Sequence, residues 1–397
     1  MILKHIKLLF IAFLISGFAV NSGFSNPQHG AEHQEGLAKE EAFSPGDMII
    51  DHIIDSYEWH IMTIGEKHIS LPLPIIIYQD GHLITFMSSA FVNHHTHQKQ
   101  ALLFNADGEM LDEETPSSDA AFGLAIMTKG PHKGKIAFID TDEYIHHQVI
   151  KEDEAAGLPW DFSITKNVVA LWFSIVLLIW IFSSMAKSYK TRKGMAPKGM
   201  QSVLEPLVVF IRDDIAKSSI GEKNYEKYLP FLLTIFFFIF LNNLLGMIPI
   251  LPGGANLTGN IAITGVLALF TFVITTYSGN KHYWIDIFNT PGVPWWLKFP
   301  IPLMPIVEVM GVFIKPFVLM VRLFANILAG HIVPLGFISL IFIFGAVNLS
   351  VGYSVSIVSI AFSVFLGLLE LLVALIQAYV FTLLSALYFG LATEEHH

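Results

Sequence analysis

Arg322 lies within the stretch from Phe317 to His331, which is apolar enough to be embedded in a membrane. A guanidinium keeps its charge even when it is buried, because its pKa stays above about 12. A fixed positive charge near the middle of a bilayer costs at least about 2.5 to 3.5 kcal/mol, so such a residue is retained for a function. We therefore expect Arg322 to face a partner or an ion path.

Ionisable and amide side chains are rare in the last two long apolar segments, where they are Glu308, Lys315, Arg322, Asn326, His331, Glu370 and Gln377. Glu308, Lys315 and Arg322 follow one another at intervals of seven residues. At about 100° per residue, this interval keeps the three side chains within about 40° of one helix face. Asn326 lies close to this polar stripe, whereas His331 falls near the opposite face.

The same two segments predict two polar pairs between them. In an antiparallel hairpin that turns near Ser350, Arg322 comes level with Gln377, and His331 comes level with Glu370. A histidine with a pKa near neutrality and a partly desolvated carboxylate are suitable proton carriers. We interpret the second pair as part of a proton path.

Each of these residues also has a simpler interpretation when it is taken alone. Glu308 or Lys315 can be interfacial, Gln377 can bond a backbone carbonyl, and His331 can be an interior histidine with satisfied hydrogen bonds. Random placement of rare polar residues would seldom produce two level pairs around a central arginine. The combination therefore favours the functional interpretation.

Five apolar segments must position these side chains, and we predict them over residues 168–185, 228–248, 257–277, 299–344 and 355–391. The fourth is about twice as long as an upright span. It either breaks into two helices at Pro316 or Pro334, or forms one long, tilted and kinked helix. The sequence thus predicts an all-α polytopic membrane protein whose last two segments form a long tilted hairpin.

A basic cluster directly follows the first predicted span and consists of Lys187, Lys190, Arg192, Lys193 and Lys198. By the positive-inside rule this side of the membrane is cytoplasmic. Residues 200–218 mix apolar and charged positions at helical spacing, which indicates an amphipathic helix on the cytoplasmic interface. We expect residues 281–298 to form a cytoplasmic loop with interfacial tryptophans, and the C-terminus to be cytoplasmic.

The composition agrees with membrane insertion, since 53% of the 397 residues are hydrophobic and only 14% are charged. Residues 1–25 have the basic start, short apolar run and small-residue pattern of a removable signal peptide. Residues 26–161 contain 23 acidic and 7 basic residues and carry a net charge of −16, while the remainder carries +6. Nucleic acid is not an expected partner of either part. The chain has no cysteine and therefore no disulfide or thiolate site.

Residues 26–160 are predicted to form a small extracytoplasmic extension of β or α+β type, and residues 161–397 to form the membrane domain. Apolar runs on both sides of Gln79-Asp80-Gly81 are typical of a β-hairpin. Residues 135–140 indicate another strand.

Histidines are concentrated in this extension, and His94, His95 and His97 invite a metal-site interpretation. They lack ligand spacing to a second cluster, so a solvated polar loop is the preferred interpretation. We expect neither a metal nor a cofactor.

The polar residues of the last two segments, with their spacing, closely resemble those of subunit a of the F-type ATP synthases. The string from Arg322 to His331 carries the resemblance, together with Glu308, Lys315, Glu370 and Gln377. Supporting matches are the run Phe240-Leu-Asn-Asn243-Leu-Leu-Gly246-Met-Ile-Pro249 and the terminal Glu-Glu-His. The resemblance covers roughly residues 160–397.

The resemblance implies that Arg322 is the essential stator charge and faces the rotor ring of c subunits. It implies that His331, Glu370 and Gln377 line a half-channel open to the outside. Asn243 and Asn326 would be polar neighbours of that path.

On the cytoplasmic side, the resemblance implies that Glu308 belongs to a second half-channel, with Lys315 as a possible polar lining residue. The chain would then be a non-catalytic, proton-conducting stator subunit with no nucleotide site. Its partners would be the c-ring, the b subunits of the peripheral stalk, lipids and protons, in a bacterial plasma membrane.

Two features depart from the family pattern. Many bacterial members have an acid at the position of His331 and a histidine at that of Glu370, which leaves the order of proton transfers open. The extension over residues 26–161 is far longer than the usual leader, and the resemblance does not explain it.

Two other classes of function compete with this interpretation. A proton-coupled secondary transporter would usually show internal repeats and discontinuous helices, but we find no repeat, and five segments do not divide evenly. A membrane-anchored, histidine-rich metal-binding protein would carry its function in the extension.

Overall fold

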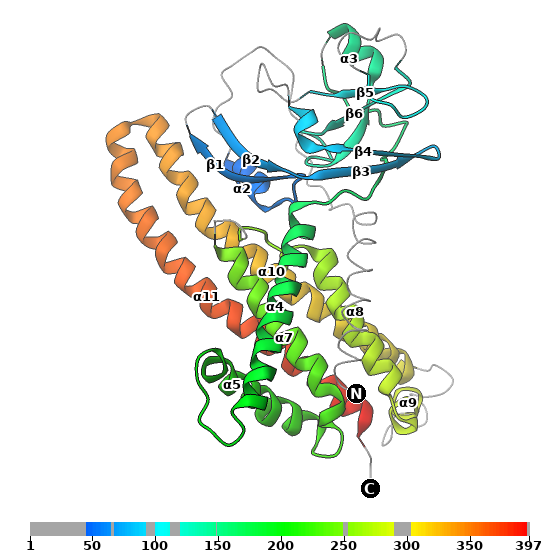
Figure 1. Cartoon of the computed structure of the whole chain (residues 1–397), viewed down its shortest axis with the longest axis vertical. Coiled ribbons are helices and arrows are strands. Elements are labelled where there is room, and N and C mark those ends of the chain that lie inside the picture. The colour runs from blue at the N-terminus through cyan, green and yellow to red at the C-terminus, as the bar shows by residue number, and fades with distance from the viewer. Residues whose placement is uncertain are drawn as a thin grey trace. The chain divides into compact units, whose positions relative to one another are not determined.

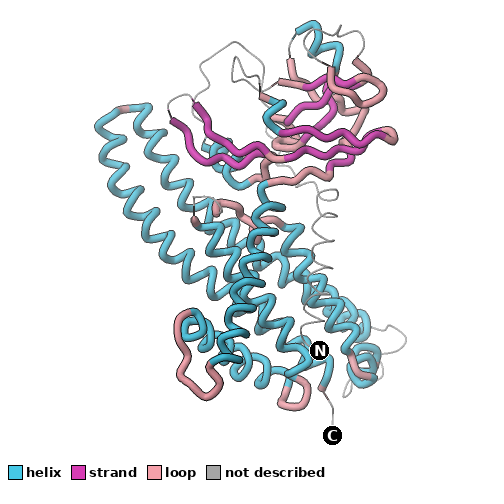
Figure 2. Tube along the Cα trace, in the orientation of Figure 1, coloured by secondary structure: helices cyan, strands magenta, loops and turns pink. Residues whose placement is uncertain are grey.

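A computed structural model describes residues 45–64, 67–92, 100–111, 120–147, 149–248, 253–289 and 303–394. The chain divides into two compact units, of which the first ends at Leu171 and the second begins at Trp172. Strands gather in the first unit and long helices in the second (Figure 1, Figure 2). The expected signal peptide and the cluster of His94, His95 and His97 lie outside the described residues.

The first unit is of mixed α and β type. Its elements are α2 (Pro45–Ile53), β1 (Glu58–Ile64), β2 (Lys67–Pro72), β3 (Pro74–Gln79), β4 (His82–Met87), η2 (Ser88–Phe91), β5 (Leu102–Phe104), β6 (Phe122–Ile126), β7 (Ile136–Ile139), α3 (Thr141–His147) and β8 (Trp160–Asp161). They form three antiparallel sheets with the orders β1-β2, β4-β3-β8 and β5-β6-β7. The predicted α+β extension is confirmed in this respect.

The predicted hairpin joins β3 to β4, and the predicted strand near residue 135 is β7. Asp80 has φ 49° and Gly81 has φ 91°. A two-residue hairpin turn of type I′ needs positive φ at both central positions, which Asp-Gly adopts at low cost. The sequence signal therefore worked here because it describes a local backbone requirement.

The core of the first unit lies between the sheets. Ile75 and Ile77 of β3 are fully buried, and so are Phe104 of β5 and Leu124 of β6. The ring of Phe104 stacks on that of Phe122 with centroids 5.3 Å apart.

A half-buried carboxylate holds the start of the first long helix, α4 (Lys166–Thr191), to the first unit. The carboxylate of Asp55 accepts hydrogen bonds from the backbone N–H groups of Ser56 and Asn167, both at 3.0 Å. Tyr57 donates a hydrogen bond of 2.5 Å to Asp161. Burial raises the pKa of Asp55 and raises that of Tyr57 well above its usual value.

A continuous helical stretch follows α4 and contains α5 (Met200–Phe210), the π-helical turn η4 (Ile211–Lys217) and α6 (Ser218–Ile220). The amphipathic helix predicted over residues 200–218 lies within this stretch. The π-helical register of η4 was not predicted.

Three helices come next: α7 (Tyr225–Met247), α8 (Ile261–Ser278) and α9 (Lys281–Phe288). The prediction of a loop over residues 281–298 was wrong for its first eight residues, which are helical as α9. Backbone contacts favour this helix, since Asn280 donates from its backbone N–H to Ala392 and from its side chain to Thr393.

The last two helices are α10 (Leu303–Val347) and α11 (Leu349–Thr393), which are antiparallel neighbours (Figure 1). Pro316 and Pro334 both lie inside α10, so the alternative of one long helix is the correct one. Asn348 joins the two helices, and its side chain caps α11 by accepting from the N–H of Ser350.

Five helices of the described chain, α4, α7, α8, α10 and α11, are long and apolar enough to cross a membrane. This confirms the prediction of five membrane segments. The C-terminal half of α11 packs through a stripe of small residues, including Ala374, Ala378 and Ser385. Small side chains allow close approach of α7 and α8 to this half of the helix.

Candidate functional site

Arg322 and Asn326 lie one helical turn apart on α10, and both are exposed on the surface of this chain. Leu319, Leu323 and Ile327 form the neighbouring stripe and are buried. α10 therefore turns an apolar stripe toward its own chain and presents the guanidinium and the amide outward.

Among the described residues, Arg322 takes part in no ion pair or hydrogen bond. Large apolar side chains on the same helix, such as Phe313 and Phe317, are likewise exposed. An unpaired guanidinium on a lipid-facing helix surface is costly. The exposed surface of α10 therefore combines a fixed positive charge with large apolar side chains.

His331 and Glu370 face each other between α10 and α11. His331 Nδ1 lies 3.3 Å from Glu370 Oε1, and both side chains are largely buried, with exposed fractions of 17% and 12%. The predicted antiparallel register therefore brings this pair together. An imidazole and a carboxyl group at this distance can pass a proton between them.

Two glycines give this pair its space. A Cβ at Gly330 would lie 3.2 Å from Glu370 Oε1, and a Cβ at Gly246 of α7 would lie 3.7 Å from His331 Nε2. Sequence reasoning missed Gly330 as a site residue and noted Gly246 only as part of a family match. Their role depends on which helices meet, which the spacing within one helix does not reveal.

Asn243 and Gln377 are buried nearby in α7 and α11. Asn243 accepts a hydrogen bond of 2.5 Å from the hydroxyl of Thr258 and donates one of 3.4 Å to the carbonyl of Ala374. Thr258 was not predicted as a site residue. The sequence predicted that Gln377 comes level with Arg322. No hydrogen bond joins the two side chains among the described residues.

Glu308 and Lys315 are half-buried on the N-terminal half of α10. Lys315 Nζ lies 5.8 Å from the ring centroid of Tyr388 on α11, a cation–π contact. No described residue forms an ion pair with Glu308. Glu308, Lys315 and Arg322 all lie on the one unbroken helix α10.

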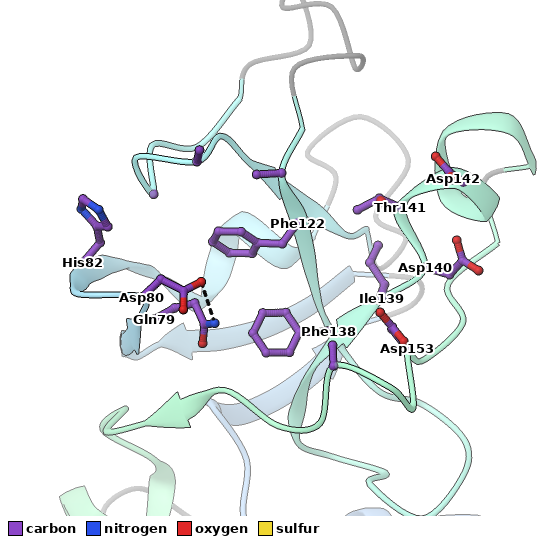
Figure 3. Close-up of a pocket in the computed structure, with 14 residues that line it drawn as sticks. Gln79, Asp80, His82, Phe122, Phe138, Ile139, Asp140, Thr141, Asp142 and Asp153 are labelled. Atoms are coloured by element: carbon purple, nitrogen blue, oxygen red, sulfur yellow. Dashed lines mark hydrogen bonds between the residues drawn. The ribbon is translucent and has the colours of Figure 1, made fainter.

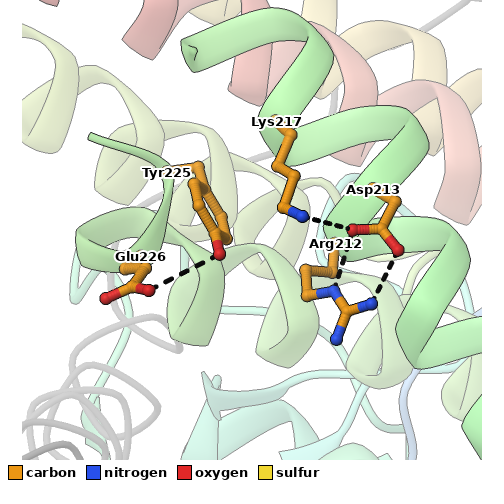
Figure 4. A network of polar contacts seen from close by, with 5 residues as sticks. All are labelled: Arg212, Asp213, Lys217, Tyr225 and Glu226. Carbon is orange, nitrogen blue, oxygen red and sulfur yellow. Dashed lines mark hydrogen bonds and ion pairs between the residues drawn. The ribbon is translucent and has the colours of Figure 1, made fainter. Parts of the chain in front are cut away.

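A second polar cluster lies in η4, outside the five candidate spans (Figure 4). Arg212 contacts Asp213 through two nitrogens at 2.9 and 2.7 Å, and Lys217 Nζ contacts Asp213 Oδ1 at 2.9 Å. These hydrogen bonds hold the pKa of Asp213 well below its usual value. Because each charge is already paired, this cluster offers little chemistry and is best explained as a structural tie.

The first unit contains a cavity of about 660 Å³ whose lining includes Asp80, Asp140, Asp153, Phe122 and Phe138 (Figure 3). Two of its carboxylates cap turns, because Asp140 accepts from the N–H of Glu143 and Asp153 from that of Ala155. No group of three potential metal ligands occurs in the described part of the chain.

The fold and the site define a class of protein: a polytopic helical membrane protein with a histidine–carboxylate pair between two long helices and an outward-facing arginine. A family model described as ATP synthase A chain matches residues 168–390. The chain belongs to the ATP synthase subunit a family, and is a multi-pass membrane protein of the proton-translocating Fo sector.

Individual relatives agree with this family. The chain is 45% identical over 246 residues to ATP synthase subunit a of Chloroherpeton thalassium, covering 60% of this chain and 69% of the relative. It is 47% identical to ATP synthase subunit a 2 of Prosthecochloris aestuarii, over 59% of this chain and 70% of that relative. It is 44% identical to ATP synthase subunit a of Myxococcus xanthus, over 60% of this chain and 75% of that relative.

A second family model, described as a domain of unknown function (DUF8433), matches residues 48–162. This range begins inside α2 and ends directly after β8, so it contains all the strands of the first unit. The matches to the ATP synthase subunit and to this domain therefore do not overlap along the chain.

Proposed function

We propose that this chain is the stator subunit that provides two offset half-channels for protons, separated by the fixed charge of Arg322. The observation that carries the proposal is the outward-facing guanidinium, which forms no hydrogen bond or ion pair with the described residues of its own chain. The expected counterpart is a carboxylate on a rotor ring of c subunits. Such a carboxylate crosses lipid only when protonated, and beside the guanidinium it ionises.

His331 and Glu370 would carry protons through the half-channel open to the outside. Their 3.3 Å contact supports this role, because proton transfer requires hydrogen-bond reach. Gln377, Asn243 and Asn326 would supply polar lining. Because the pair holds one imidazole and one carboxyl group, either can receive the proton first.

Glu308 would belong to the half-channel open to the cytoplasm, with Lys315 as a lining residue. A proton that enters the half-channel open to the outside must leave it on the rotor, because the arginine neither releases a proton nor accepts one. Each unit charge that moves through 100 mV contributes about 2.3 kcal/mol, which several steps per turn convert into torque.

The surroundings follow from the same proposal. The domain boundary would lie near residue 160, with the extension extracytoplasmic, the C-terminus cytoplasmic and the whole chain in a bacterial plasma membrane. The basic cluster from Lys187 to Lys198 supports this orientation. Peripheral-stalk b subunits would be further partners, and the chain itself would contribute no nucleotide site or catalysis.

The test removes the fixed charge. In membranes that contain the assembled complex, Arg322→Ala should lower proton-driven ATP synthesis by roughly two orders of magnitude, as expected when a preorganised electrostatic group is lost. Immunoblotting of the purified complex should show normal assembly. Lys281→Ala is the matched control, because it removes an exposed cation outside the five candidate spans and should retain most of the activity. An assembled and active Arg322→Ala variant would contradict the proposal.

A further inference from the structure

The sheet β4-β3-β8 of the first unit has two apolar faces. On its inner face, Ile75 and Ile77 are fully buried. On its outer face, Tyr78 is paired with Leu83 on one side and with Trp160 on the other. An antiparallel sheet with one buried face normally presents polar side chains on the other.

The side chains of this outer row are solvent-accessible. Leu83 is 65% exposed, Trp160 is 64% exposed and Tyr78 is 46% exposed. The row continues along the same face through the paired positions Pro74 with Met87 and Ile76 with Thr85. We call the face formed by these seven residues the outer sheet face.

No residue of the outer sheet face is charged, and Thr85 and Tyr78 supply its hydroxyl groups. Continuous apolar surface of this kind marks a contact with a protein or a membrane. Whether this face contacts a protein or a membrane can be decided from the position of β8 next to the membrane helix α4 in the sequence.

β8 leads directly into the membrane helix α4. Trp160 precedes Lys166, the first residue of α4, by six positions, and six residues reach at most about 20 Å. The connection is also held by hydrogen bonds. Ile164 donates to the carbonyl of Pro74 at 3.0 Å, and Lys166 donates to that of Ser56 at 2.9 Å.

We propose that the outer sheet face rests in the interfacial layer of the lipid bilayer that α4 enters. The short, hydrogen-bonded connection keeps this face close to the membrane surface. Trp and Tyr are the side chains that favour this layer, because their rings are apolar and their N–H and O–H groups remain hydrated. The extension is thereby a lipid-docked domain.

The uncharged face also defines the kind of lipid contact. Attraction to anionic headgroups requires lysine or arginine near the surface, and the outer sheet face has neither. Docking therefore depends on apolar burial and needs no anionic lipid. It should persist in zwitterionic phosphatidylcholine and at high salt.

Nitroxide labelling tests this docking directly, because the natural chain contains no cysteine. A single cysteine is introduced in the full-length chain as Leu83→Cys or, on the same face, Met87→Cys. Asp142→Cys on α3 is the matched control at an exposed position. The labelled proteins are reconstituted into phosphatidylcholine vesicles, and the accessibility of the nitroxide to oxygen and to a water-soluble nickel chelate is measured.

Docking predicts that the ratio of oxygen to nickel accessibility at positions 83 and 87 is at least fivefold higher than at position 142. Ratios at positions 83 and 87 equal to that at position 142 would place the face in water and overturn the proposal. Shielding of both positions from both reagents would also overturn it, since a protein surface would then cover the face. All three substituted side chains are exposed, so the fold should tolerate each change.

Discussion

Gly330 illustrates how a residue without a side chain can set the chemistry of its neighbours. The Oε1 atom of Glu370 lies 3.2 Å from the position that a Cβ at residue 330 would occupy, and His331 follows directly in the chain. This contact is tighter than most Cβ contacts, so a methyl group there would shift the carboxyl group by a few tenths of an ångström. The spacing between the imidazole of His331 and the carboxyl group of Glu370 therefore depends on a residue that has no side chain.

We expect Gly330→Ala to slow proton flux by on the order of tenfold, because small displacements of reacting groups are costly to transfer. Gly336→Ala on the same helix is the control, since nothing lies within 4 Å of its added Cβ. Proton uptake by vesicles that contain the assembled complex measures both variants. Equal rates for the two would show that the carboxyl position is unimportant.

At this scale the sequence predicted the pairing of His331 with Glu370 but not the surroundings of the pair. In an antiparallel pair of helices, residues that lie level with each other have residue numbers with nearly the same sum. A few rare polar residues that satisfy this condition are therefore sufficient to align the two helices. The contacts of Gly330, Gly246 and Thr258 depend on a third helix and a loop, for which periodicity carries no information. The outward direction of Arg322 likewise depends on which stripe of α10 is buried.

At the scale of elements, α11 is divided by what it packs against. Its C-terminal half is buried through small residues, while its N-terminal half carries exposed apolar side chains such as Phe365 and Leu368. Gly390 belongs to the packed half, where an added Cβ would lie 2.0 Å from the carbonyl oxygen of Ser219 in α6. Close approach of two backbones at this point requires glycine.

Gly390→Ala should therefore destabilise the helical unit by about 1 to 3 kcal/mol through overpacking. The control is Gly367→Ala on the same helix, where the added methyl group meets nothing within 4 Å. Thermal unfolding of the detergent-solubilised full-length chain should give a lower midpoint for the first variant alone. Identical midpoints would mean that α6 and α11 separate without cost.

Element boundaries were the weaker part of the sequence prediction. Hydropathy located all five spans, because lipid exposure demands long apolar runs. It missed α9, which is short and held by backbone contacts of Asn280, and it missed the π-helical turn of η4. Neither feature changes the local hydropathy.

At the scale of the whole molecule, a charged group ties the extension to its membrane helix. Asp55 is half-buried and accepts hydrogen bonds from the backbone N–H groups of Ser56 and Asn167, and Lys166 is the charged group beside it. Burial raises the pKa of Asp55 above its value of 3.8 in the unfolded chain. Between pH 3.8 and this raised pKa, Asp55 therefore binds a proton more strongly in the folded protein than in the unfolded chain.

The sign of the pH dependence follows from this raised pKa. The contribution of Asp55 to stability is fully present below pH 3.8 and is lost as the pH rises through the higher pKa of the folded state. Asp55→Asn should remove this contribution, so the stability difference between variant and natural chain should change steadily across that range. Protease resistance of the extension in the full-length chain between pH 3.5 and 7 measures it. A difference independent of pH would contradict the account.

In the proposed mechanism protons cross only with the moving rotor, because Arg322 blocks direct passage between the half-channels. Proton flux can be measured through complexes whose rotor has been immobilised by cross-linking to the stator, with a pH-sensitive dye trapped inside the vesicles. We expect no flux through the natural complex and a clear leak through Arg322→Ala. A locked Arg322→Ala complex that is as proton-tight as the natural one would contradict it.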